Sequence, residues 1–147
     1  MRYYLFIILL LCSIATNAQC AYPDARSAAW KPKWLTTMDL PPNGDFYYYD
    51  IGYGEGESYE NAFDNAIANV SKKRLFATGQ RVAFDIAEAA KNESITVKAR
   101  IEQEYWERCF DPVQRKRLYY LTFLCIVASN PSYDISRVKT DKKYLTP

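Results

Sequence analysis

Three glutamates, Glu102, Glu104 and Glu107, stand close together in the sequence and are of a type that could do chemistry. Paired carboxylates catalyse glycoside hydrolysis, one as a general acid and the other as a base or nucleophile. On an extended strand, Glu102 and Glu104 would point to the same face about 7 Å apart. Lys98 and Arg100 would share that face, so charge pairing explains the carboxylates more simply than catalysis. We therefore assign no catalytic residue to this cluster.

A second chemical pattern is Gly52-Tyr53-Gly54-Glu55-Gly56, which stands where a dinucleotide-binding loop would join a strand to a helix. The third glycine comes one residue too early for that motif. Glu55 would also place a carboxylate where a pyrophosphate needs free amide groups. We expect Gly52, Gly54 and Gly56 to form a structural turn instead, with at least one of them at positive φ.

The chain contains no histidine, and this excludes several classes of enzyme. Ser-His and Cys-His nucleophile pairs and histidine-ligated metal centres cannot be built from these residues. The four cysteines do not provide the close ligand pairs of a zinc site. We therefore predict that the protein is not an enzyme and holds no metal and no cofactor.

The first residues have the three parts of a secretory signal peptide. A positive charge at Arg2 is followed by an apolar run that begins at Leu5 and then by the small residues Thr16 and Ala18. The run is several residues short of the roughly 20 that cross a bilayer. We predict cleavage after Ala18, export to the periplasm or the cell surface, and no transmembrane anchor in the mature chain.

Export would permit disulfide bonds among the cysteines of the mature chain, which are Cys20, Cys109 and Cys125. An odd number leaves one thiol over. If a bridge forms, we expect it to join Cys109 to Cys125, because these two residues belong to adjacent predicted strands. A bridge from Cys20 would overturn this pairing.

The balance of residue types is that of a globular protein, with 49% hydrophobic and 24% charged residues. Lysine and arginine number 19 against 17 acidic residues, so no strong net charge attracts nucleic acid. The one basic cluster, Arg115-Lys116-Arg117, follows Asp111-Pro112 and is typical of a solvated turn. We expect no nucleic-acid partner.

The elements that must position these residues follow from the spacing of apolar side chains. Residues 19–45 are rich in proline and predict an extended arm that two tryptophans pin to the body. Residues 46–53 are aromatic and predict a strand. From Ser58, apolar residues recur at helical spacing, which predicts a helix that Ser58 caps and Gly79 ends.

The second half of the chain predicts a hairpin followed by a tail. Residues 80–92 fit both a short strand and a helical turn. Residues 95–105 alternate between apolar and charged, which predicts a strand with one face exposed to solvent. A turn at 111–117 leads to a strand at 118–128, and residues 129–147 are polar and predict a loose tail.

These elements together predict an α+β fold, in which one long helix packs on an antiparallel sheet of about three to four strands and an extended arm precedes it. The predicted boundaries are a signal peptide at 1–18, the arm at 19–45, an α+β domain at 46–128 and a polar tail at 129–147. One domain is the number that a chain of this length normally holds.

The strand at 118–128 is apolar on both faces, whereas one helix covers only one of them. Soluble monomers rarely leave such a face in water. We expect the arm to cover part of it, and a second copy of the protein or an envelope partner to cover the rest. The candidate interaction surface comprises Tyr48, Trp106, Tyr120, Leu124 and Ile126.

The sequence also resembles a known family. The likeness lies in Pro32-Lys33-Trp34 of the arm, in the glycine segment 52–56 and in Ala62 and Ala66 of the predicted helix, and it covers roughly residues 30–128. These features resemble the Lpp-twenty-like family of bacterial envelope proteins, whose relatives include the N-terminal domain of a flagellar assembly protein. The resemblance implies an exported α+β protein without enzymatic activity.

Two hypotheses about function follow. The first is a non-catalytic bacterial envelope protein that acts as a structural or interaction module. The second is a protein that binds a small ligand or a glycan through exposed aromatic residues. An exposed aromatic cluster beside a concave pocket would favour the second, and a strongly perturbed carboxylate in a cleft would favour an enzyme.

Overall fold

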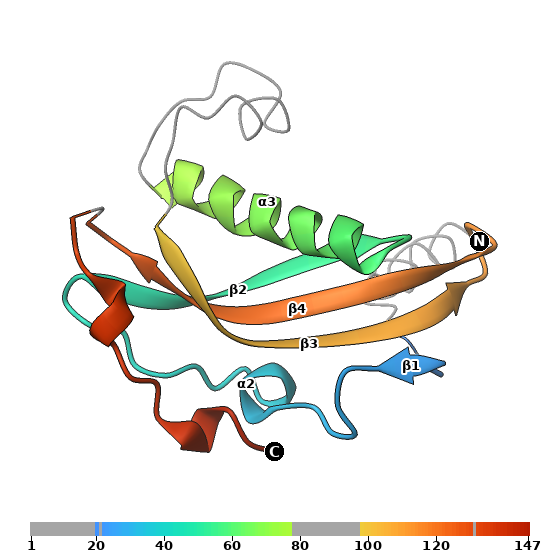
Figure 1. Ribbon diagram of the computed structural model, residues 1–147, viewed down its shortest axis with the longest axis horizontal. Helices are drawn as coiled ribbons and strands as arrows, with labels where there is room; N and C mark the ends of the chain where they lie inside the picture. Colours follow the sequence, from blue (N-terminus) through green and yellow to red (C-terminus); the bar gives the residue numbers. More distant parts are fainter. Residues whose placement is uncertain (1–19, 21, 78–97, 131) are drawn as a thin grey trace, which may run out of the picture.

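The computed structural model describes residue 20 and residues 22–77, 98–130 and 132–147, without side chains at 73–77. In these ranges the chain is an α+β fold around one four-stranded antiparallel sheet, with the strand order β1-β3-β4-β2 (Figure 1). The α+β class and the antiparallel sheet that the sequence predicts are confirmed. The expected signal peptide, the helix stop at Gly79 and the ambiguous residues 80–92 lie outside the described residues.

The strands are β1 (Ala25–Arg26), β2 (Tyr47–Gly56), β3 (Ala99–Asp111) and β4 (Lys116–Ala128). The helices of the described ranges are α2 (Lys33–Thr36), α3 (Tyr59–Ala77) and two 3₁₀ turns, η1 (Ile135–Arg137) and η2 (Lys142–Tyr144). The arm is not extended throughout, because it contains α2. Pro32 is tolerated at the start of this helix, since a backbone N–H at that position would make no hydrogen bond within the helix. None of the helices described is long and apolar enough to span a membrane.

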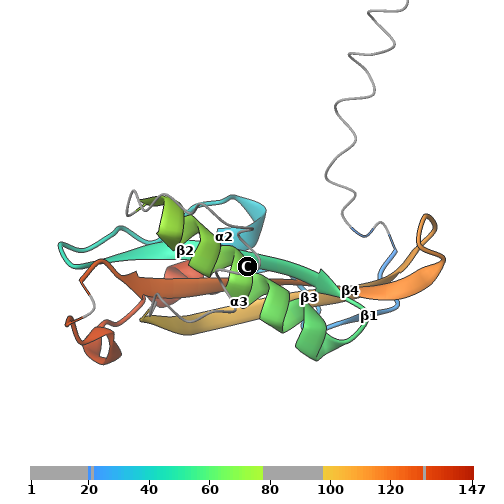
Figure 2. The same ribbon diagram turned by 90° about the horizontal axis from the view of Figure 1, so that it is seen from above.

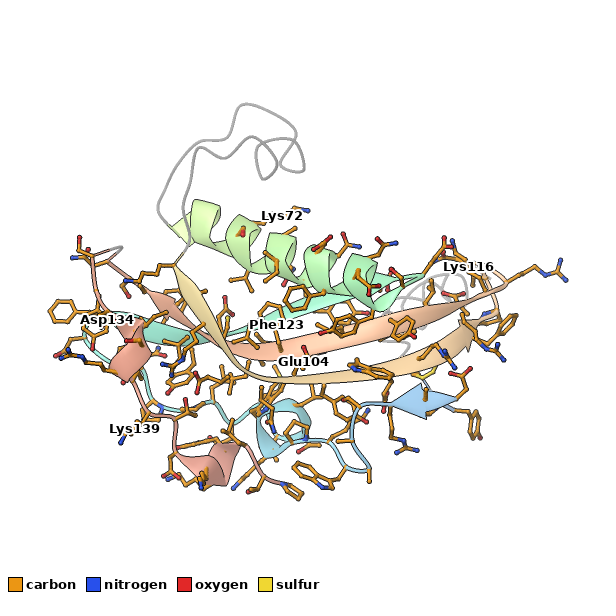
Figure 3. The ribbon with its side chains drawn as sticks, in the orientation of Figure 1. Lys72, Glu104, Lys116, Phe123, Asp134 and Lys139 are labelled. Carbon is orange, nitrogen blue, oxygen red and sulfur yellow. A yellow bond between two sulfur atoms is a disulfide. The ribbon has the colours of Figure 1, made fainter. Side chains whose placement is uncertain are left out.

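Helix α3 lies on one face of the sheet and crosses it obliquely above β2 and β4 (Figures 1 and 2). The Ser58 hydroxyl caps it by accepting a hydrogen bond from the Asn61 amide at 3.1 Å, as predicted. Phe123 points from β4 toward the helix (Figure 3). The buried residues beneath α3, called core A here, are Ala62, Ala66, Val70, Leu121, Phe123, Cys125 and Val127.

Gly52, Gly54 and Gly56 do not form the predicted turn. All three belong to strand β2, and none of them has a positive φ. They serve the approach of the helix instead, since a Cβ on Gly54 would come within 3.0 Å of backbone atoms of both Ala62 and Ala66. Glycine is therefore required here for space rather than for an unusual backbone conformation.

Strand β2 forms an edge of the sheet, yet several of its outward backbone groups already have partners within the chain. The Phe46 carbonyl, just before β2, accepts a hydrogen bond from the Ser129 amide beside β4. Because the backbone groups of successive residues point to alternate sides of a strand, the odd-numbered residues of β2 direct their amides and carbonyls away from β4. Five of these groups form hydrogen bonds within the chain. The amides of Tyr49, Ile51 and Tyr53 donate to the side chains of Asn43, Asp50 and Asn69, respectively. The Tyr47 carbonyl accepts from the Gly44 amide, and the Glu55 carbonyl accepts from the Asn65 side chain. These contacts thus protect part of the β2 edge against the addition of another strand.

Removal of these side-chain bonds is expected to make the protein associate. The double variant Asn43→Ala/Asn69→Ala leaves the amides of Tyr49 and Tyr53 available to a strand of another molecule. Light scattering should show more association than in the parent protein. Asn61→Ala, at an exposed position of α3, serves as the control and should behave like the parent. Equal scattering from the double variant and the control would contradict the role of the edge contacts.

The face of the sheet opposite α3, called the cleft face here, is covered by the arm and by the C-terminal segment (Figure 1). Trp34 of α2 is fully buried against it, and its indole N–H donates to Gln103 Oε1 at 2.7 Å. Leu124 and Ile126 are 0% exposed. Their assignment to an interaction surface is therefore wrong, because Ile135 and the rest of the C-terminal segment complete a cover that the sequence did not predict.

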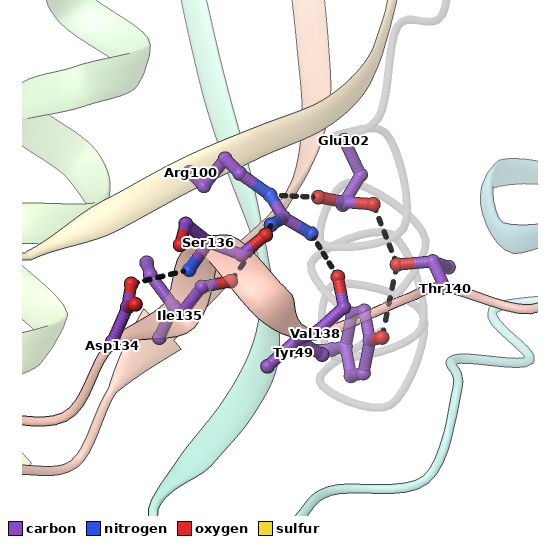
Figure 4. A network of polar contacts seen from close by, with 8 residues as sticks. All are labelled: Tyr49, Arg100, Glu102, Asp134, Ile135, Ser136, Val138 and Thr140. Carbon is purple, nitrogen blue, oxygen red and sulfur yellow. Dashed lines mark hydrogen bonds and ion pairs between the residues drawn. The ribbon is translucent and has the colours of Figure 1, made fainter.

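A β-bulge between Ile101 and Gln103 decides which side chains of β3 meet the C-terminal segment. Arg100 and Glu102 both point toward the C-terminal segment, so the prediction that the charged face of this strand is exposed to solvent is wrong. Glu102 accepts hydrogen bonds of 2.6 Å from both Arg100 and Thr140. The Arg100 guanidinium also donates to three backbone carbonyls at 2.6–2.9 Å, those of Ile135, Ser136 and Val138 (Figure 4). The segment that the sequence predicts to be a loose tail is thereby held to the sheet.

Candidate functional site

A cleft of about 770 Å³ opens on the cleft face, between the sheet and the arm. Its sheet wall comes from alternate residues of three strands, because every second side chain of a strand points to the same face. These residues are Ile51, Tyr53 and Glu55 of β2, Tyr105, Glu107 and Asp111 of β3, and Tyr120 and Thr122 of β4. The arm contributes Cys20, Lys31, Leu35, Thr36 and Met38.

The most buried charge of the cleft is Glu107, which is 7% exposed. The Tyr105 hydroxyl donates to its carboxylate at 2.8 Å, and Lys31 Nζ lies 3.4 Å from it. Burial and this hydrogen bond raise the pKa of Tyr105 to about 12. Glu107 thus has both a donor and a counter-charge, as a buried carboxylate requires.

The more exposed part of the cleft carries two tyrosines beside two carboxylates. Tyr53 is 46% exposed, and its hydroxyl donates to Glu55 at 3.3 Å. Partial burial and the Glu55 charge raise the pKa of Tyr53 to about 12. Burial, and after it the charges of Asp111 and Glu55, raise the pKa of Tyr120. Both hydroxyls therefore stay protonated at neutral pH.

Only one member of the predicted interaction surface, Tyr120, lines the cleft. Tyr48 and Trp106 lie on the other face of the sheet, packed against core A. Sequence reasoning did not assign Tyr53 and Glu55 to a site, because the segment was interpreted as a turn. The alternation of Ile51, Tyr53 and Glu55 along one strand is the signal that would have placed them on one face.

The three glutamates of β3 do not form a catalytic pair. The prediction that Glu102 and Glu104 share a face is wrong, because Glu102 is the extra residue of the bulge and the alternation of side chains shifts there. Glu104 lies on the α3 face, where it accepts a hydrogen bond from the Tyr59 hydroxyl at 2.8 Å (Figure 3). Of the three, only Glu107 lines the cleft.

The disulfide of the described chain joins Cys20 to Cys109, with their Cα atoms 5.8 Å apart. The expected bridge between Cys109 and Cys125 is therefore wrong. Strand register explains the error, since Cys109 stands opposite Leu118 and Cys125 stands opposite Ile101, near the other end of the hairpin. Cys125 is buried in core A outside the bridge, and its thiol donates to the Asp50 carbonyl at 3.5 Å. The Cys20 bridge fixes the beginning of the arm beside the cleft.

Alkaline pH is expected to destabilise the fold through Tyr105. Below pH 10.0, its ordinary pKa, the hydroxyl is protonated in both the folded and the unfolded chain, and its contribution is complete. Between pH 10 and about 12 the unfolded chain loses this proton while the folded chain keeps it. The free energy of unfolding therefore falls as the pH rises, by up to about 2 kcal/mol.

Urea unfolding near pH 9 and near pH 11.5 measures this loss of stability. Because other tyrosines also titrate, the comparison is with Tyr105→Phe, which lacks the hydroxyl and should lose less stability over the same interval. An identical loss in parent and variant would contradict the assignment to Tyr105.

The arrangement in the cleft is suited to binding. Neutral hydroxyl donors, ring surfaces and carboxylates converge on one open space, which is the usual composition of a ligand site. Within the described ranges, no three cysteine, aspartate or glutamate side chains gather closely enough to hold a metal ion.

Comparisons with protein-family models, with curated proteins and with solved structures found no match to this chain. The function of the cleft is therefore inferred from its own residues.

Proposed function

We propose that this chain is an exported, non-catalytic envelope protein that binds a small polar ligand in the cleft between its arm and its sheet. The observation that carries the proposal is the position of Tyr53 and Tyr120, two tyrosines that line a concave space of about 770 Å³. That volume lies in the range of ligand sites, about 300–1,000 Å³. An exposed aromatic group beside a concave pocket is the feature that favours a small-ligand or glycan binder over a purely structural module.

The polar groups of the cleft support a polar ligand. Three tyrosine hydroxyls, three carboxylates and the Lys31 ammonium face or flank the space, and Ile51, Leu35 and Met38 supply apolar surface. Such a mixture can orient a ligand through hydrogen bonds while burying its carbon atoms. No cofactor is part of the proposal.

Export is part of the proposal and rests on two features. The first 18 residues have the pattern of a cleaved signal peptide. A structural disulfide between Cys20 and Cys109 is favoured in an oxidising compartment such as the periplasm or the cell surface. The resemblance to the Lpp-twenty-like family agrees with this location and with the absence of catalysis. Mass spectrometry of the protein recovered from the envelope should find a chain that begins at Gln19.

A macromolecular partner, whether an envelope protein or a second copy of the chain, is also part of the proposal. It would have to use surface other than Leu124 and Ile126, which are buried within the chain. Part of the β2 edge is protected as well. Tyr48 and Trp106, which are only partly buried on the α3 face, belong to the surface that remains.

The test is an NMR titration of the oxidised protein with three sets of small probes: neutral disaccharides, dicarboxylates and diamines. A ligand of the cleft should shift the amide resonances of Tyr53, Glu55 and Thr122, and leave those around Ile67, exposed on α3, unchanged. If no probe set shifts the cleft resonances, or if the shifts map to the α3 face, the cleft is not the ligand site.

A matched pair of variants separates the cleft from the rest of the surface. Tyr53→Ala removes an exposed ring that lines the cleft, and Phe110→Ala removes one that is 59% exposed outside it. Neither ring belongs to the buried core, so both variants should fold. Tyr53→Ala is expected to weaken the binding of the active probe, and Phe110→Ala is expected to leave it unchanged. Equal affinities for the two variants would contradict the proposed site.

A further inference from the structure

The cleft gathers acidic groups in a chain that is basic overall. Lysine and arginine exceed aspartate and glutamate by 19 to 17 in the whole sequence. Among the described residues that line the cleft, however, three are acidic, namely Glu55, Glu107 and Asp111, and one, Lys31, is basic. The negative charge of the cleft is thus a local property and does not follow from composition.

Lys31 does not neutralise this excess, because it is already committed to Glu107. Its Nζ lies 3.4 Å from the Glu107 carboxylate, whose side chain is 9% exposed. A buried carboxylate holds its counter-charge strongly, since separation would leave the charge uncompensated. The remaining negative charge of the cleft therefore belongs to Glu55 and Asp111.

Glu55 and Asp111 are held by neutral donors. Glu55 accepts the Tyr53 hydroxyl, and Asp111 accepts the backbone amides of Val113 and Gln114 at 2.8 and 3.0 Å. These hydrogen bonds orient the two carboxylates and leave their charge in place. Lys116 stands opposite Asp111 in the register of β3 and β4, but it forms an ion pair with Glu57 instead.

The tyrosines complete a surface suited to positive charge. Burial raises the pKa of both tyrosine hydroxyls; after burial, the charge of Glu55 adds to the raised pKa of Tyr53 and of Tyr120, and the charge of Asp111 adds to that of Tyr120. Aromatic rings attract ammonium groups through their negative faces. Rings and carboxylates thus both favour a positively charged ligand, whereas an anionic ligand would be repelled by the uncompensated negative charge.

We propose that the cleft binds an alkylammonium group against the rings of Tyr53 and Tyr120, where the negative charges of Glu55 and Asp111 attract it. This inference rests on the proposed function and specifies the class of ligand. The ammonium can belong to a free amine or to a lysine side chain of a peptide, since both present the same group on an apolar chain.

The test uses three five-carbon probes that differ in charge: cadaverine, 1,5-pentanediol and glutarate. Calorimetric or NMR titration of the oxidised protein should show binding of cadaverine, weaker binding of the diol and no binding of glutarate. Affinity for cadaverine should fall as salt is added, because the attraction is electrostatic. A lysine-containing tripeptide and its norleucine counterpart then distinguish a peptide from a free amine as the source of the ammonium.

Glu55→Gln and Asp111→Asn remove one charge each and keep the hydrogen-bond acceptors. Each is expected to weaken cadaverine binding about fivefold, the effect of one partly exposed charge pair. Asp134→Asn, a neutralisation outside the cleft, is the control and should leave the affinity unchanged. Equal effects of all three variants would overturn the proposal.

The outcomes separate this inference from the function on which it rests. If the diol, glutarate or a disaccharide binds in the cleft at least as well as cadaverine, the alkylammonium assignment fails and the binding function stands. If no probe of any charge shifts the cleft resonances, both fail.

Discussion

Gly54→Val is expected to lower the free energy of unfolding by about 3 kcal/mol. A side chain at this position would meet the backbone of Ala62 and Ala66, and the backbone of a helix cannot move aside as a flexible side chain can. Helix α3 would have to lift away from β2, which would loosen core A over its whole length. Urea unfolding followed by circular dichroism measures the change.

The matched pair Gly54→Ala and Gly52→Ala tests the reason for this effect. A Cβ on Gly52 would meet the ring of Phe123 and a methyl group of Val70, and both of these side chains can adjust. Gly52→Ala should therefore destabilise the protein by about 1 kcal/mol, clearly less than Gly54→Ala. If the two variants have the same stability, the close approach of helix and strand at Gly54 is not what requires glycine.

Loss of the Cys20–Cys109 bridge is expected to lower the free energy of unfolding by about 3–4 kcal/mol. The two cysteines are 89 residues apart in sequence, so the bridge removes much conformational freedom from the unfolded chain. Cys20→Ser should show this loss in urea unfolding. The variant should also bind cadaverine, which represents the proposed ligand, more weakly, because the beginning of the arm is no longer held beside Tyr105 and Glu107.

Reductant supplies the control for this variant. It should lower the stability of the parent protein to that of Cys20→Ser and have no effect on Cys20→Ser itself. Peptide mass spectrometry without reduction should recover Cys20 linked to Cys109. A peptide that links Cys109 to Cys125 would contradict the bridge and restore the pairing expected from sequence.

Local patterns in the sequence were sufficient for several elements. The helical spacing of Ala62, Ala66 and Val70, with Ser58 before it, predicted α3 and its cap, because both depend on residues a few positions apart. The hairpin between β3 and β4 followed from a turn sequence between two apolar runs. The strand at 46–53 was predicted from its run of aromatic residues, although β2 continues through Gly56.

The bulge in β3 shows where local patterns fail. Alternation of apolar and charged residues predicted one face exposed to solvent, but a single extra residue at Glu102 moves every later side chain to the opposite face. The sequence around the bulge contains no glycine that would have indicated it. Placement of Glu104 beside α3 and of Glu107 in the cleft followed from that shift.

By itself, the sequence determined the absence of histidine chemistry, the α+β class, the helix α3 and the hairpin, because composition and short-range spacing are local properties. Only the tertiary structure decided the cover of Leu124 and Ile126, the Cys20–Cys109 bridge and the cleft. Each of these joins segments distant in sequence, such as Lys31 with Glu107 or Arg100 with the carbonyls of the C-terminal segment. Such contacts depend on which segment packs on which face of the sheet, and the free energy that selects this arrangement comes from burial over the whole chain rather than from any local pattern.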